Sequence, residues 1–121
     1  AQAILPSRRN LSDQQIRLMA AKGGVIGVMG FETVVGVNDI VKGLCDHIDH
    51  IAGLAGLSHV ALGLDLYAYF YGRNASLPRD AINGYGELHL IREELAARGY
   101  APAEIEAVFG ANFVNFIKNS L

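Results

Sequence analysis

Asp65 occupies the position in this chain that is most typical of catalytic chemistry. It follows an apolar run that begins at His59 and gives way to aromatic residues by Tyr71 (HVALGLDLYAYFY). Such a run between turn signals indicates a buried parallel strand, with Asp65 near its carboxyl end. Parallel α/β folds place their chemistry at that edge. A carboxylate there either takes part in catalysis or accepts hydrogen bonds from backbone N–H groups, and the sequence leaves both interpretations open.

Aromatic residues directly behind Asp65 form a second candidate feature. Tyr67, Phe70 and two further tyrosines, Tyr69 and Tyr71, follow the predicted strand. These rings either line a pocket or pack within their own loop. Among them we assign Tyr67 to substrate binding.

A cluster of histidines and acids at residues 46–50 (DHIDH) has the composition of a metal site. Its members are three and four residues apart, so pairs of them would share a helix face. Ile48 and Ile51 define the buried face of the same helix, however. We therefore interpret the cluster mainly as surface and helix-packing polarity, with metal ligation as the alternative. His59 precedes its strand, at the end opposite Asp65, and is expected to make a structural hydrogen bond.

Composition excludes several classes of protein. The chain has 121 residues, 51% of them hydrophobic, and a formal net charge of −2, as one globular domain would and unlike a strongly basic nucleic-acid-binding protein. It contains no apolar run long enough to cross a membrane and no leader of the secretory type. Its one cysteine, Cys45, cannot form an internal disulfide and is expected to be buried. The localisation therefore stays unknown.

The remaining charged residues are ordinary surface candidates, with one exception. His89 lies four residues before Glu93, the spacing of a surface pair on a helix. Arg8 and Arg9 are adjacent in the basic first part of the chain. They form a candidate anion-binding corner.

Helices and strands alternate along the first half of the chain. Ser12 and Gln15 have capping-box spacing and predict a helix over 13–22, with Ile16, Met19 and Ala20 on its buried face. A buried strand is predicted over 25–31. Its glycines, Gly27 and Gly30, would weaken it unless another backbone packs closely, as in a crowded barrel wall.

Helices dominate the rest. Asn38 is the predicted N-cap of an amphipathic helix that ends near Gly56. After the strand at Asp65 and a loop over 68–84, we expect helices over 85–98, from Pro102, and over 111–118.

Two parallel strands with helices on one side do not make a closed structure. They leave two open edges and one uncovered face. We therefore expect the chain to be part of a larger α/β sheet or barrel, incomplete by itself. The missing strands would come from another chain, a second copy or a further segment of polypeptide.

Several segments resemble the membrane (renal) dipeptidase family in order and spacing along nearly the whole chain. These segments are SRRNLSD at residues 7–13, GGVIGV at 23–28, DHIDHI at 46–51, HVALGLD at 59–65, the stretch from Glu94 to Tyr100, and GANF at 110–113.

The resemblance implies a zinc-dependent dipeptidase, that is, a metallopeptidase that acts in proteolysis. It also implies a relationship to the amidohydrolases and a (β/α)8 TIM-type barrel. Residues 1–121 would be a single segment, the C-terminal part of that barrel domain, and would supply its seventh and eighth strands with their helices. The N-terminal part of the barrel or a second chain would be its partner, and a homodimer is a further candidate. No nucleic acid and no membrane span are expected.

Two functional residues carry over from the resemblance. Asp65 matches the acid at the end of the last strand, which acts as general base on the metal-bound water, and Arg9 matches an arginine that binds the carboxylate of a dipeptide. The family's zinc ligands lie before Ala1, so this segment is expected to bind no zinc specifically and to be inactive alone. The family usually has Asp-Phe-Asp-Gly where this chain has Asp65-Leu66-Tyr67-Ala68. Because Tyr67 replaces the second acid, the alternative is an inactive dipeptidase-like barrel that binds a small ligand or partner.

Overall fold

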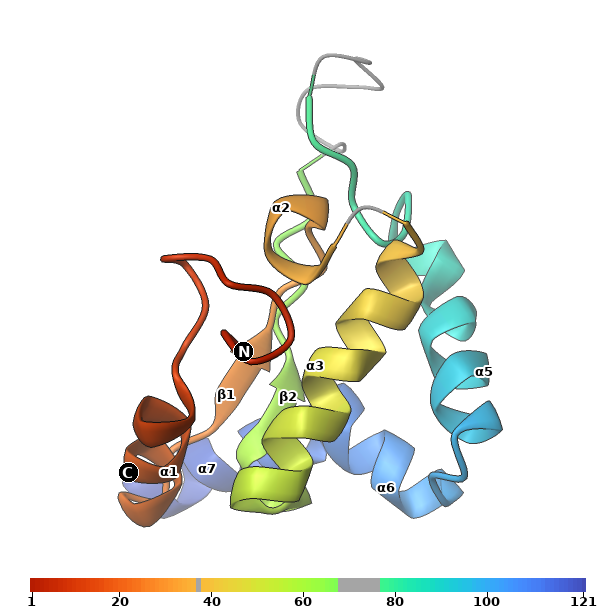
Figure 1. Cartoon of the computed structure of the whole chain (residues 1–121). Coiled ribbons are helices and arrows are strands. Elements are labelled where there is room, and N and C mark those ends of the chain that lie inside the picture. The colour runs from red at the N-terminus through yellow and green to blue at the C-terminus, as the bar shows by residue number, and fades with distance from the viewer. Residues whose placement is uncertain (37, 68–76) are drawn as a thin grey trace.

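Two short parallel strands lie at the centre of the structure, and the helices surround them (Figure 1). In this computed structural model, which describes residues 1–36, 38–67 and 77–121, β1 spans Ile26–Val28 and β2 spans Val60–Leu62. Each strand is shorter than the apolar run that predicted it, but the prediction of two parallel strands is confirmed. The barrel to which they were assigned is taken up below as a proposal.

Backbone pairing continues beyond the regular part of both strands. The Gly63 N–H donates to the Val28 carbonyl over 3.0 Å, and the Gly30 N–H donates to the Leu64 carbonyl over 3.1 Å. In a regular parallel ladder the Gly30 N–H would donate to the Gly63 carbonyl. Because it donates to the Leu64 carbonyl instead, the pairing has shifted by one residue, as in a bulge. Asp65 follows directly, with a φ of 53°, the one positive φ among the described non-glycine residues.

The two strand backbones make close contact where both lack a side chain. A Cβ on Gly63 would lie 3.1 Å from the Gly27 Cα, and one on Gly27 would lie 3.4 Å from the Gly63 Cα. The expectation that another backbone packs closely is therefore confirmed for Gly27, whereas the nearest atoms to a Cβ at Gly30, which follows β1, would be side-chain atoms of Leu64 and Ala81. The contact between Gly27 and Gly63 brings the carboxyl ends of β1 and β2 together.

Helix α3 (Ile40–Ala55) covers one face of the strands, and its periodic apolar residues Leu44, Ile48 and Ile51 are buried. The predicted N-cap, Asn38, is wrong by one residue. Asp39 caps the helix instead, because its carboxylate accepts a hydrogen bond from the Lys42 N–H over 3.1 Å.

Helix α1 (Asp13–Ala21) begins with the predicted capping box, since Ser12 and Gln15 bond each other's backbone N–H groups. Ile16 is fully buried, but Met19 is 42% exposed and was wrongly placed on the buried face. The described residues offer no surface that covers Met19.

A short helix that the sequence did not predict, α2 (Glu32–Val35), directly follows β1. No side chain caps it, so it has no local sequence signal. Tertiary packing holds it: Val34 and Val35 are buried against Ile40 of α3. This helix fixes the path of the chain just past the end of β1.

The C-terminal third is helical, as predicted, but is divided more finely. Its elements are the 3₁₀ turn η2 (Tyr85–Glu87), α5 (Leu88–Ala97), α6 (Pro102–Glu106), the π-helical turn η3 (Ala107–Ala111) and α7 (Asn112–Ser120). A 3₁₀ turn, η1 (Leu57–His59), precedes β2. The Asn112 side chain donates to the carbonyls of Leu57 and Val60 over 2.7 and 2.8 Å and so ties the start of α7 to the start of β2.

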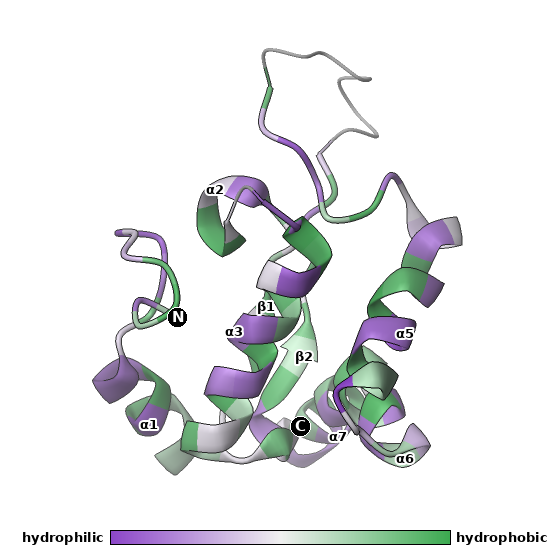
Figure 2. Ribbon diagram, turned by 45° about the vertical axis from the view of Figure 1, so that its right-hand side comes forward, coloured by the Kyte–Doolittle hydropathy of each residue, from purple (hydrophilic) through white to green (hydrophobic). Residues whose placement is uncertain are grey.

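The hydrophobic core lies between the strands, α3 and the C-terminal helices, and Figure 2 shows apolar residues along β1, β2 and the inner side of α3. No helix in the described part of the chain is long and apolar enough to cross a bilayer. The fully buried side chains are those of Ile16, Leu44, Cys45, Ile48, Val60, Ile82, Ile91, Leu95 and Val108.

Replacement of Gly43 in α3 by alanine is expected to destabilise the protein by about 1–3 kcal/mol. A Cβ there would lie well under 3 Å from the Val35 carbonyl oxygen, so α2 would have to move away from α3. Gly53→Ala, in the same helix, is the matched control. A Cβ at Gly53 meets nothing within 4 Å, so the better helix propensity of alanine should stabilise by about 0.5–1 kcal/mol. Denaturant unfolding of both variants measures the difference, and equal stabilities would contradict the packing described.

Candidate functional site

The three residues assigned to the site from the sequence and the resemblance, Arg9, Asp65 and Tyr67, line one cavity of about 340 Å³ together with Phe31 and Pro78. The cavity lies past the carboxyl ends of β1 and β2, because Phe31 follows β1 and Asp65 follows β2. It therefore combines a cation, an anion and an aromatic wall at the edge where a parallel sheet presents its functional side chains. The roles of these residues stay predictions.

Asp65 is exposed and strained. Its backbone adopts the left-handed region, with a φ of 53°, which costs free energy for a residue other than glycine. No hydrogen bond or ion pair reaches its carboxylate from the described part of the chain. The role of structural acceptor belongs to Asp80 instead, whose Oδ2 accepts the Tyr67 N–H over 2.8 Å. Among the described residues, no backbone N–H therefore uses Asp65 as a structural acceptor, and its catalytic role stays a prediction.

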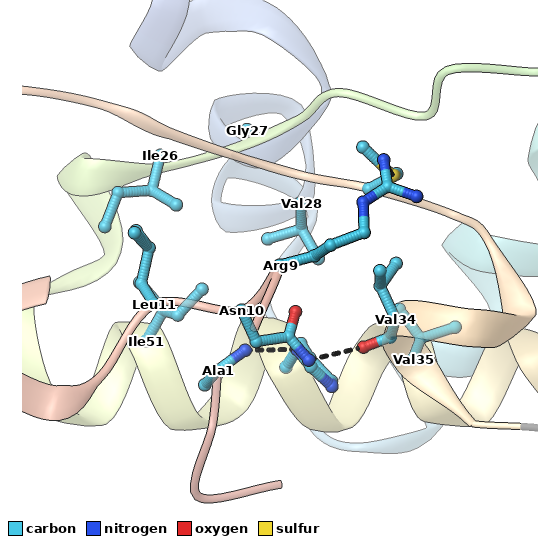
Figure 3. A pocket seen from close by; sticks show the side chains of 12 residues that line it. Ala1, Arg9, Asn10, Leu11, Ile26, Gly27, Val28, Val34, Val35 and Ile51 are labelled. Atoms are coloured by element: carbon cyan, nitrogen blue, oxygen red, sulfur yellow. Dashed lines mark hydrogen bonds between the residues drawn. The ribbon is translucent and has the colours of Figure 1, made fainter. Parts of the chain in front are cut away.

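Arg9 is exposed and also carries no ion pair with any described residue. Its Nη2 lies 3.7 Å from the Met29 Sδ, and Figure 3 shows the side chain passing Val28 at the edge of a second, smaller cavity of about 120 Å³ between β1 and α3. A guanidinium whose forked donors bind no carboxylate among the described residues is suited to bind a carboxylate from outside.

Asn10 positions the segment that carries Arg9. Its side-chain amide donates to the Leu5 carbonyl over 3.0 Å and to the Val34 carbonyl of α2 over 2.8 Å (Figure 3). The N-terminal loop is thereby fastened to the helix that follows β1. Asn10 is therefore a positioning residue. It lies within the SRRNLSD segment, but the sequence alone gave no reason to assign it a role.

The returning segment at residues 78–81 closes the other side of the pocket. Asp80 forms an antiparallel bridge with Phe31, the Glu32 N–H donates to the Arg79 carbonyl over 3.0 Å, and the Ala81 N–H donates to the Gly30 carbonyl over 2.7 Å. Sequence reasoning missed Phe31, Pro78 and Asp80, because a pairing between such distant segments leaves no local signal. The expected aromatic residues Tyr69, Phe70 and Tyr71 lie outside the described residues.

The residue 46–50 cluster serves helix packing. His47 is buried at 2% exposure, not at the surface, and its Nδ1 contacts the backbone nitrogen of Ala1. Burial is the largest of the causes that lower the pKa of His47 to about 4. His50 Nε2 donates to Asp13 of α1 over 2.8 Å.

The acids of the same cluster bind an arginine of another helix. Arg98, which follows α5, donates to Asp46 over 2.7 Å, to Asp49 over 2.6 Å and to Glu94 over 2.8 Å. The Tyr100 hydroxyl donates to the other oxygen of Asp49 over 2.6 Å. Burial is the larger cause that raises the pKa of Tyr100, and this hydrogen bond is the second. The cluster thus joins α3 to α5.

The other single candidates also have structural roles. His59 Nδ1 donates to the Gly24 carbonyl over 2.7 Å, which confirms the expected structural bond. His89 contacts the Gly86 carbonyl instead of Glu93. Cys45 is buried, as expected, and burial raises the pKa of its thiol to about 12. Across residues 1–36, 38–67 and 77–121, no group of three or more histidine, cysteine or acidic side chains could hold a metal ion.

Comparison with known proteins connects this site to a family. The family model described as membrane dipeptidase (peptidase family M19) matches residues 1–120. An uncharacterized protein in the pqqA 5′ region of Klebsiella pneumoniae is 33% identical over 98% of this chain and 44% of its own length. The dipeptidase ataJ of Aspergillus terreus is 28% identical over 96% of this chain and 28% of its own length. The chain therefore spans less than half the length of these curated relatives.

A solved structure has the same fold. The crystal structure of an amidohydrolase from Pseudomonas aeruginosa superposes with a TM-score of 0.81 over 97% of this chain and 42% of that protein, at 20% sequence identity. The arrangement of two parallel strands and their helices is therefore that of a segment of this larger protein.

Replacement of Arg98 by lysine is expected to lower the free energy of unfolding by about 1–3 kcal/mol, because one ammonium group cannot replace a fork that serves three carboxylates. The matched control is Arg17→Lys. Arg17 is an exposed residue of α1 for which the described part of the chain shows no ion pair, so this variant should stay within about 0.5 kcal/mol of the parent. Urea unfolding measures both, and equal stabilities would show that the cluster does not join the helices.

Proposed function

The chain belongs to the membrane dipeptidase family, and from this premise we propose that it is the C-terminal part of a zinc-dependent dipeptidase that hydrolyses the peptide bond of dipeptides. The observation that supports this proposal most is that Arg9 and Asp65 line the same cavity beyond the carboxyl ends of β1 and β2. A dipeptide presents a carboxylate and a scissile amide a few bonds apart, and the cavity offers one group suited to each.

Arg9 would bind and orient the substrate. Its guanidinium fork matches the planar carboxylate of a dipeptide in a bidentate contact. Holding that end of the substrate places the peptide bond toward Asp65, and fixing the reacting groups in this way lowers the entropic part of the barrier. Because this end of the site recognises a free carboxylate, it favours dipeptides over the interior of longer chains.

Asp65 would be the proton carrier of the reaction. Water adds to the peptide carbonyl and gives a proton to the Asp65 carboxylate, the C–N bond breaks, and the carboxyl returns the proton to the leaving amine. The products are two free amino acids. Since no described residue hydrogen-bonds the carboxylate, both its oxygens are available to a water molecule.

Zinc does not fit the described residues as a complete site, because Asp65 is the one acid in the cavity and no larger group of ligands is present there. A zinc site takes about four ligands, most often histidine, cysteine or carboxylate. We therefore assign the zinc ligands to residues outside the described part of the chain. When bound, the metal would lower the pKa of a water and polarise the substrate carbonyl.

The segment 1–121 would act as one piece of a (β/α)8 barrel, with β1 and β2 as its seventh and eighth strands. The remaining strands would come from a further segment of the polypeptide or from a second chain. The complete barrel could in turn form a homodimer. Surface apolarity supports an incomplete structure: α7 exposes 52% of Phe113, 48% of Val114 and 40% of Ile117. Side chains of this kind require a covering partner.

A second candidate function follows from Tyr67. It stands where dipeptidases of this family usually carry a second acid, so a barrel that binds a small carboxylate ligand without hydrolysing it is the alternative. The exposed carboxylate of Asp65, to which no described residue donates a hydrogen bond, favours the enzyme. Release of free amino acids from a dipeptide by the complete protein separates the two functions.

Asp65→Asn in the complete protein is expected to reduce dipeptide turnover by a factor of about 10²–10⁴. Asparagine cannot take the proton at neutral pH, but it is close in size to aspartate and tolerates the left-handed backbone of residue 65. The melting temperature and the zinc content should therefore remain unchanged. The matched control is Asp39→Asn, which also removes one carboxylate but keeps an equally good N-cap for α3 and should retain full turnover. A destabilised Asp65→Asn protein with normal turnover per folded molecule would remove Asp65 from the mechanism.

Arg9→Ala is expected to raise the KM for a dipeptide by about 10- to 100-fold, the loss of a hydrogen-bonded charge pair, while zinc content stays unchanged. Arg9→Lys should not restore the KM, because a point charge lacks the fork. Arg17→Ala, at an exposed position of α1, is the control for loss of a positive charge. Steady-state kinetics with a dipeptide measure all three, and equal KM values for arginine and lysine at residue 9 would exclude bidentate recognition.

A further inference from the structure

The cavity that contains Arg9 and Asp65 is also lined by two aromatic rings and a proline. Phe31 contributes from the end of β1, Tyr67 from the segment after β2, and Pro78 from the returning segment. The ring centroids of Phe31 and Tyr67 lie 5.8 Å apart at an interplanar angle of 67°, an edge-to-face contact. The volume of about 340 Å³ is within the range of small-molecule sites.

Hydrogen bonds hold the backbone of two of these residues in place. Asp80 accepts the Tyr67 N–H over 2.8 Å and also forms the backbone bridge with Phe31. The backbones of Phe31 and Tyr67 are therefore both tied to one residue of the returning segment. A preformed surface loses little entropy when a ligand covers it, which increases the affinity that apolar contact supplies.

The wall lies in the same cavity as the group that would bind the substrate carboxylate. In a dipeptide, the residue that carries the carboxylate also carries the C-terminal side chain on the adjacent carbon. If Arg9 holds the carboxylate, that side chain is confined to the remaining surfaces of the cavity. Among the described residues, and apart from Asp65, these are Phe31, Tyr67 and Pro78.

We propose that Phe31, Tyr67 and Pro78 form the specificity pocket of this site, and that it selects dipeptides whose C-terminal residue is aromatic. This inference rests on the proposed dipeptidase function. Tyr67 is its central residue, because an acid at residue 67 would add negative charge and remove a ring from the wall. A phenyl side chain packs edge-to-face or offset against such rings, and a methyl group leaves them in contact with water.

The test compares kcat/KM for glycyl-L-phenylalanine with that for glycyl-L-alanine in the complete protein. The parent should prefer the phenylalanine dipeptide by at least about tenfold, as an apolar pocket does for added apolar groups. Tyr67→Ala should reduce this preference by about 2- to 10-fold, the value of one aromatic pair, whereas Tyr67→Phe should retain it. The matched control is Tyr85→Ala, since Tyr85 is 77% exposed in η2 and does not line the cavity.

Two outcomes overturn the specificity pocket: a parent without preference, or a preference that is the same in the parent and in Tyr67→Ala. Should Tyr67→Ala fail to fold, Tyr67→Leu keeps apolar bulk without a ring and is expected to show the same loss. If neither dipeptide is hydrolysed, the proposed hydrolysis fails but the pocket is still tested by calorimetry with N-acetyl-phenylalanine and N-acetyl-alanine. Tighter binding of the aromatic compound, lost in Tyr67→Ala, supports the pocket, and equal binding of the two compounds contradicts it.

Discussion

The close contact between the backbones of Gly27 and Gly63 is the constraint on which the functional end of this chain depends. A Cβ on Gly63 would lie 3.1 Å from the Gly27 Cα, so a side chain there would require the facing backbone to shift by a few tenths of an ångström. With the backbones this close, pairing continues to Gly30 and Leu64 and shifts by one residue there. Asp65 directly follows this shift in the pairing, and its backbone has a left-handed conformation. The position of its exposed carboxylate therefore depends on how the two strands end.

Polar residues divide between two tasks. On the helices they join one element to another, as Arg98 does between α3 and α5 and as His59 does between η1 and the start of β1. Beyond the carboxyl ends of the strands, Arg9 and Asp65 have no charged partner in the described part of the chain, although they share a cavity. An exposed ion pair stabilises a protein only slightly, so the fold does not depend on pairing Arg9 with Asp65. Charged groups that converge on one cavity without a charged partner among the described residues are typical of a site that binds a ligand.

Local signals were sufficient for the elements that have them. The capping box predicted α1, the 3.6-residue period predicted α3, and the apolar run before Asp65 predicted β2, although β2 ends at Leu62, three residues before Asp65. Long-range packing decided the rest: α2 has no cap and is held by its contact with α3. The aromatic wall depends on the bridge between Phe31 and Asp80, two residues with no relation in sequence. The charge distribution indicated an anion-binding corner at Arg8 and Arg9, and resemblance to a family selected Arg9 of the two.

A crystal structure of the complete protein with a bound, non-hydrolysed dipeptide analogue tests the central claim most directly, namely that Arg9 and Asp65 face one substrate. The account predicts the carboxylate of the analogue on the Arg9 guanidinium in a bidentate contact of about 2.7–2.9 Å. It also predicts the Asp65 carboxylate within hydrogen-bonding distance of a water beside the amide carbon. A dipeptide carboxylate bound elsewhere, with Arg9 turned toward a protein carboxylate, would contradict the account.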